Sequence, residues 1–170
     1  LSLLLSLAIS VSGFAQENLS ANVFTGLFFP FNDFTATDYE GYKPNLGVGA
    51  GIGYNFGNAF RLRGDLLYGS INGNNEVSYY QTNIFEPSLS GELNLLGLFN
   101  NDGGVKLNLQ GGTGFSIYHG SLYDRTTGAR LNESPPRSDK SVSTNAFVSY
   151  GANIGIPLSN HLELNLGYLN

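Results

Sequence analysis

The sequence predicts an all-β fold, an antiparallel up-and-down β-barrel of eight strands, of which we expect seven within this chain. Apolar side chains recur at every second residue in segment after segment, which is the period of a strand with one apolar face. Glycine fills 23 of the 170 positions and only 12% of the residues are charged, about half the charged share of a typical soluble domain. Short and long connections alternate along the chain, as they do in a barrel of antiparallel strands.

The clearest strand is residues 45–57, NLGVGAGIGYNFG. Its even positions from Leu46 to Phe56 are apolar or aromatic, whereas its odd positions are Gly or Asn. A helix is excluded by the period and by the density of glycine. Six further segments show the same alternation: residues 19–29, 60–70, 88–99, 105–120, 142–157 and 161–170.

Two features of this pattern need separate explanations. Pro87 has no N–H to donate to a ladder, so the strand at 88–99 either begins near Ser88 or carries a bulge there.

Short connections are predicted at 57–59, 100–104 and 158–160, and long ones at 30–44, 71–86 and 121–141. Because single-chain bacterial barrels of this type have an even number of strands, we expect an eighth strand to follow Asn170.

The first residues have the composition of an export signal. Residues 1–11 are apolar apart from serines, and small residues follow at Gly13 and Ala15. We therefore predict a signal peptide over residues 1–16, with its basic start preceding Leu1, and a barrel domain over residues 17–170. The apolar run is too short for a transmembrane helix, which needs about 20 apolar residues. The net charge of −5 and the pI near 4.8 make nucleic acid an unsuitable partner.

The two faces of the predicted strands indicate what each one contacts. The less apolar face is mainly Gly, Ser and Asn with few charges, which suits the crowded lumen of a small barrel better than a water-exposed surface. The apolar face would then meet lipid. Aromatic residues form predicted interfacial girdles: Phe56, Phe60 and Phe99 beside the short turns, and Tyr68 toward the long loops. A soluble lipocalin-like carrier would turn the apolar face inward instead.

The strands GVGAGIGYNFG and FRLRGDLLYG, with the signal ending SGFAQ, resemble the barrel-domain proteins common in Bacteroidota. The chain as a whole resembles the small outer-membrane β-barrel proteins of Gram-negative bacteria, of the OmpA-transmembrane and OmpX kind. The resemblance covers residues 17–170 and implies export through the periplasm to the bacterial outer membrane. It implies no single activity, because such folds support several functions.

Strand parity places six charged residues in the lumen: Arg61, Arg63, Asp65, Glu92, Lys106 and Glu163, with Glu86 beside them. Because unpaired buried charges are costly, we expect these residues to pair as a polar plug. A gate that rearranges to open a narrow conductance is the alternative. No metal-ligand spacing occurs, so neither metal nor cofactor is expected.

The remaining function classes concern the outer rim and the loops. In a lipid-modifying enzyme, Ser121 and His119 could supply a hydroxyl group and a base at the rim of the barrel. However, the strand alternation points His119 toward lipid, and the sequence offers no carboxylate partner for it. We therefore assign no catalytic residue. The loop cations Arg125, Arg130, Arg137 and Lys140 are candidates for binding lipopolysaccharide phosphates, a surface glycan or another protein. We expect a structural, adhesion or minor transport role, with the lipid-modifying enzyme and the soluble exported carrier as alternatives.

Overall fold

The computed structural model is a single curled antiparallel sheet, described over residues 3–14, 18–31, 45–74, 78–99, 104–134, 143–159 and 162–169. Nine strands make up the sheet: β1 (Leu3–Phe14), β2 (Leu19–Phe31), β3 (Asn45–Phe56), β4 (Phe60–Asn74), β5 (Ser78–Asn94), β6 (Lys106–Asp124), β7 (Arg130–Ser134), β8 (Ser143–Ser159) and β9 (Leu162–Leu169). A 3₁₀ turn, η2 (Gly97–Phe99), follows β5. No helix in these ranges is long and apolar enough to cross a membrane.

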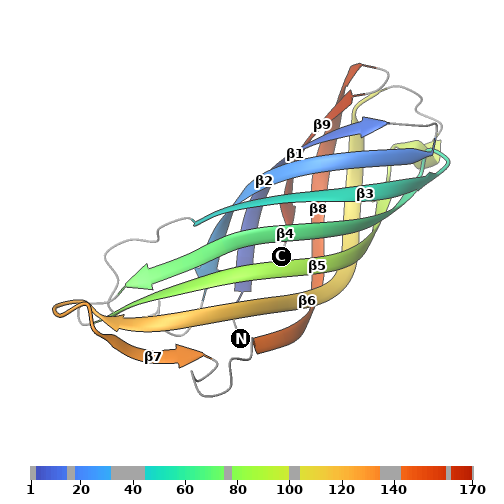
Figure 1. Cartoon of the computed structure of the whole chain (residues 1–170). Helices are drawn as coiled ribbons and strands as arrows, with labels where there is room; N and C mark the ends of the chain where they lie inside the picture. Colours follow the sequence, from blue (N-terminus) through green and yellow to red (C-terminus); the bar gives the residue numbers. More distant parts are fainter. Residues whose placement is uncertain are drawn as a thin grey trace.

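Eight of the strands form a closed ring (Figure 1). The order is β5-β4-β3-β2-β1-β9-β8-β6, and fifteen residue pairs between β5 and β6 close it. The short β7 lies outside the ring and pairs only with the outer end of β6. Over the length of β9 the closed ring gives each strand a neighbour on both sides, as a sheet surrounded by lipid requires, whereas residues 143–150 of β8 pair with β6 alone among the described strands.

All seven predicted strands are confirmed, as β2, β3, β4, β5, β6, β8 and β9. The eighth place in the ring is held by β1, between β2 and β9. This strand is the segment that its composition also marks as a signal peptide. Removal of residues 1–16 as a signal stays a prediction, as do a further strand beyond Asn170 and a barrel domain starting at residue 17.

The predicted connection at 71–86 is wrong. Strands β4 and β5 instead continue their ladder to the pair Asn74–Tyr79, so that Ile71 lies opposite Thr82. The Asn and Gly residues at 72–75 obscured the β-branched and aromatic residues that follow. Residues 95–99, predicted as the end of a strand, form a turn and η2. The connection at 121–141 contains the end of β6 and all of β7.

Pro87 lies within β5 rather than at its beginning, and the described pairs of β5 and β6 keep one register without the predicted bulge. Pro87 pairs with Leu66 of β4, whereas the ladder to β6 passes from Phe85–Ile117 to Ser88–Gly114 without pairing the residues between. Both strands advance by the same number of residues across this gap. The missing N–H therefore interrupts hydrogen bonding on one side only and leaves the register unchanged.

Burial in the barrel is the reverse of burial in a soluble protein. Among the described residues only Ile71 is a buried hydrophobic side chain, whereas thirteen buried residues are polar or charged. The outward side chains of β3 are apolar and exposed, Ile52 by 65% and Leu46 by 61%. Such a wall needs a lipid surrounding, and it opposes the soluble carrier with an apolar lumen.

Glycine on the inward face of β3 makes room for the side chains of β4. A Cβ at Gly51 would overlap the Asp65 carboxylate, and one at Gly53 would lie 3.2 Å from Cδ of Arg61. Gly64 lies on the outer face of β4, where an added Cβ would meet no atom of the described residues within 4 Å. The alternation of glycine with apolar residues therefore follows from a crowded lumen facing a bulky polar strand.

We expect Gly51→Ala to lower the free energy of unfolding by about 1–3 kcal/mol, because the added methyl group must displace the Asp65 carboxylate or the β4 backbone. Gly64→Ala is the matched control, and its stability should be unchanged or higher by up to about 1 kcal/mol. Urea unfolding in lipid vesicles, followed by far-ultraviolet circular dichroism, measures both. Equal stability of the two variants would contradict the packing argument.

Candidate functional site: the charged lumen

The lumen contains one connected network of charges, which we call the interior network: Arg61, Arg63, Asp65, Glu92, Lys106 and Glu163. Strand β4 supplies the first three residues, and β5, β6 and β9 supply one each. Period-two alternation turns all six side chains to the same side of the sheet. The structure therefore brings together every charged residue that strand parity places in the lumen, apart from Glu86.

The ion pairs form an unbranched chain from Asp65 to Lys106. Arg63 lies 3.0 Å from Asp65 and 3.4 Å from Glu92. Arg61 lies 3.8 Å from both Glu92 and Glu163. Glu163 in turn pairs with Lys106. Three cations and three anions balance, so the network is neutral as a whole and each buried charge has an opposite charge beside it.

Amide side chains extend the network to the rest of the wall. Asn22 of β2 donates to the Asp65 carboxylate at 3.1 Å, and Asn153 of β8 donates to Glu92 at 3.4 Å. The Arg61 Nε–H donates to the Asn55 side-chain oxygen on β3 at 2.6 Å. Sequence reasoning missed these three partners, although their inward parity was visible. With them the network reaches β2, β3, β4, β5, β6, β8 and β9 across the lumen.

Burial differs between the middle and one end of the network. The Glu92 and Glu163 side chains are only 3% and 2% exposed, whereas the Lys106 side chain is 31% exposed. Lys106 begins β6 near the short connections, so its ammonium group reaches the mouth of the lumen on that side. Charge is therefore most desolvated at the two glutamates and least desolvated at Lys106.

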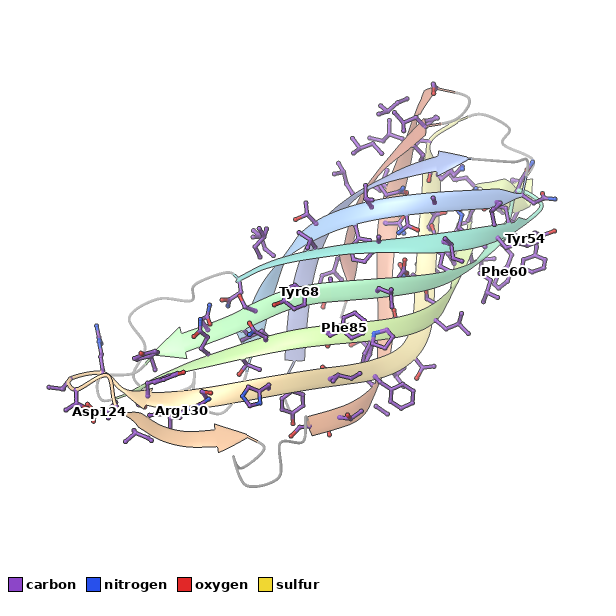
Figure 2. The ribbon with its side chains drawn as sticks, viewed as in Figure 1. Tyr54, Phe60, Tyr68, Phe85, Asp124 and Arg130 are labelled. Carbon is purple, nitrogen blue, oxygen red and sulfur yellow. The ribbon has the colours of Figure 1, made fainter. Side chains whose placement is uncertain are left out.

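The predicted girdle residues lie on the outer wall. Phe56 and Phe60 flank the turn at 57–59 with ring centroids 5.7 Å apart, and Phe99 of η2 is 83% exposed. Tyr68 lies about 20 Å farther along the barrel axis for a tilt near 40°, directly opposite Phe85 in the register. Figure 2 shows Tyr54 and Phe60 near one end of the barrel, with Tyr68 and Phe85 near the middle of its length. Their contact with lipid headgroups stays a prediction.

The outer end of the sheet projects beyond the lipid-facing band. The 19 residues of β6 rise about 48 Å at a tilt near 40°, well over the ~25 Å apolar band. Tyr79 and Tyr123 stack there at 4.9 Å, and Arg130 lies 6.0 Å from the Tyr123 ring centroid. The β6–β7 hairpin thus has its own packing outside the membrane.

The loop cations are only partly described. Arg125 lies exposed in the hairpin turn. Arg130 begins β7 and is labelled in Figure 2. Arg137 and Lys140 lie outside the described residues. Binding of phosphate, glycan or protein by these residues stays a prediction.

The geometry around His119 and Ser121 does not support the alternative of a lipid-modifying enzyme. His119 is exposed on β6, opposite Asn83 of β5. The Ser121 side chain is buried, and its hydroxyl accepts a hydrogen bond from Arg130 at 2.5 Å. Within the described ranges, no group of three or more His, Asp or Glu residues could hold a metal ion.

Removal of a central charge should destabilise the barrel more than removal of a terminal one. Glu92→Gln leaves Arg61 and Arg63 with an uncompensated buried charge, so we expect the free energy of unfolding to fall by about 3 kcal/mol. Lys106→Gln is the comparison, and its partly exposed ammonium group should cost about 1 kcal/mol. Urea unfolding in vesicles gives both values. A larger loss for Lys106→Gln would contradict the proposed order of burial.

The turn between β6 and β7, outside the membrane, is held by the Asp124 carboxyl group, so its stability should depend on pH. The Asp124 carboxylate accepts the backbone N–H of Thr127, the hydroxyl of Thr127 and the backbone N–H of Thr126, and these bonds hold its pKa below the ordinary value of 3.8. A lowered folded-state pKa means that the stabilisation is present above the unfolded pKa and is lost as the pH falls through the folded one.

We therefore expect the Thr126 and Thr127 amide resonances to titrate with a midpoint below pH 3.8. A pH series of heteronuclear NMR spectra of the refolded protein measures this midpoint. The same resonances should not titrate in Asp124→Asn, which is the control. A midpoint at or above the ordinary value would show that the carboxylate does not order the turn.

A family model described as the outer membrane protein beta-barrel domain matches residues 1–170, the whole chain. No curated protein and no solved structure matches the chain. The family match agrees with the closed antiparallel ring, the apolar outer wall and the polar lumen. The chain therefore belongs to the outer membrane protein beta-barrel domain family and is a protein of the bacterial outer membrane.

Proposed function

We propose that this protein is a closed outer-membrane barrel, in which the interior network acts as a structural plug and the projecting β5–β6–β7 end serves for interaction outside the membrane. The proposal of a structural plug rests on the neutral interior network. Its ion pairs and amide hydrogen bonds join seven of the eight ring strands through the lumen. A lumen bridged in this way leaves no continuous wide path for water or solutes.

A transport role would require the plug to move. Arg61 and Arg63 together contact Asp65, Glu92 and Glu163, so opening a path would separate several charge pairs in a desolvated lumen. Such a rearrangement is costly unless new partners replace the old ones. We infer that the barrel is non-conducting at rest and that it is not an enzyme.

Planar-bilayer recordings of the refolded chain test the plug. The wild-type protein should show no large, stable conductance step. Arg61→Ala combined with Arg63→Ala removes the two bridging side chains, so we expect brief, small openings. Leu62→Ala combined with Leu66→Ala changes the outer wall of the same strand, where these residues are 39% and 52% exposed, and should leave the recordings unchanged.

A large, stable open step in the wild-type protein would overturn the proposal. Unchanged recordings from the double arginine variant, with its fold retained, would show that the plug does not depend on these two residues. Retention of the fold is judged for every variant by the shift in gel migration on heating, since folded barrels of this kind migrate differently from the unfolded chain.

A further inference from the structure

The lumen contains a cavity of about 110 Å³ on the loop side of the interior network. Phe24 of β2, Leu67 of β4, Glu86 of β5 and Phe147 of β8 line it, and Arg63 and Asp65 form its boundary with the network. The rest of its lining includes the polar residues Ser88, Gln110, Ser149, Asn153 and Asn165 and the end of β9, residues 167–169. One water molecule needs roughly 10–15 Å³ of such space, so the cavity would hold several waters or one small organic molecule.

Glycine positions allow the two aromatic rings to form the cavity wall. A Cβ at Gly49 would overlap the Phe24 ring, and a Cβ at Gly114 would lie 2.8 Å from Cζ of Phe147. Each ring therefore lies against bare backbone on a neighbouring strand. With Leu67, the rings give the cavity a largely apolar lining around a single carboxyl group that the interior network does not use.

Charge in this part of the lumen is unbalanced. Among the described residues, the acids that face the lumen are Asp65, Glu86, Glu92 and Glu163, and the cations that face it are Arg61, Arg63 and Lys106. The three cations pair with the other three acids, and among the described residues no Lys or Arg forms an ion pair with Glu86. The Ser116 side chain hydrogen-bonds to the Glu86 carboxyl group. When Glu86 is ionised, one additional positive charge beside it would balance the charges of these described residues.

We propose that this cavity binds a small organic monocation, an ammonium group attached to a short hydrocarbon chain. The ammonium group would form a charge-assisted hydrogen bond with Glu86. The hydrocarbon chain would pack against Leu67 and the two rings, whose faces also attract a cation. A divalent metal ion is a poorer candidate, because among the described residues no group of three or more acidic or histidine side chains could hold one.

The test uses the full chain refolded in zwitterionic micelles, with 4,4,4-trifluorobutylammonium as the probe and fluorine NMR as the measurement. We expect saturable binding to the wild-type protein. Glu86→Gln should weaken it at least ~10-fold, the equivalent of about one charge-assisted hydrogen bond. The neutral probe 4,4,4-trifluorobutanol should bind at least ~10-fold more weakly than the ammonium probe for the same reason.

A second pair of variants distinguishes binding in the cavity from partition into detergent. Leu67→Trp fills the cavity while leaving Glu86 in place, and it should abolish saturable binding. Leu66→Trp adds the same ring at the neighbouring position on the outer wall, where the native side chain is 52% exposed, and it should leave binding intact. If Glu86→Gln does not fold, this pair and the neutral probe still decide the question.

Three outcomes would overturn the proposal: no saturable binding to the wild-type protein, equal binding of the alcohol and the ammonium probe, or binding that survives Leu67→Trp. Closed bilayer recordings would be unaffected by any of these results. The proposed plug and the proposed cation site are therefore tested independently of each other.

Discussion

The structure depends on a lumen that is too narrow to hold bulk water and is enclosed by a wall that faces lipid. Lipid leaves backbone groups no outside partner, so the sheet must close on itself. Eight strands close at a diameter that side chains alone must fill. Apolar side chains are drawn to the lipid, which leaves polar groups for the interior. Those groups are buried as deeply as the core of a soluble domain, with Glu163 at 1% exposed, and they must therefore satisfy one another.

This constraint explains why glycine and charge are distributed unequally among the strands. Strand β4 carries Arg61, Arg63 and Asp65 inward, and the facing strand β3 has Asn55, Gly53 and Gly51 at the corresponding inward positions. Large side chains on one strand and small or absent ones on the next fill the lumen without overlap. The same complementarity recurs on the loop side, where Gly49 and Gly114 accommodate Phe24 and Phe147. There the space is incompletely filled, and the cavity beside Glu86 results.

Period-two alternation was sufficient to predict seven ring strands, the inward face of each and the six residues of the interior network, because each inference needs only local parity. It was insufficient where one sequence pattern suits two different structures. Residues 5–12, LSLAISVS, alternate apolar with small residues and suit both an export signal and strand β1. The extension of β4 and β5 was missed because the Asn- and Gly-rich residues 72–75 resemble a loop, although residues 71–74 pair with residues 79–82 in one continuous hairpin. The order of pairing within the network, the amide partners and the cavity depend on side-chain positions in three dimensions, which parity does not specify.

The two proposals assign different tasks to the two halves of one lumen, and the difference follows from how charge is neutralised in each. On the side of the short turns, every acid of the interior network has a cation within the chain, and the pairs tie opposite walls together. On the loop side Glu86 lies among Phe24, Leu67 and Phe147, where Ser116 hydrogen-bonds to it but no described Lys or Arg forms an ion pair with it. A barrel shaped only for stability would have no need of a carboxyl group at position 86, since an apolar side chain there would pack against Leu67 and the two rings. A carboxyl group beside an unfilled, largely apolar space therefore suits a cation that the described residues do not supply better than it suits the packing of the barrel.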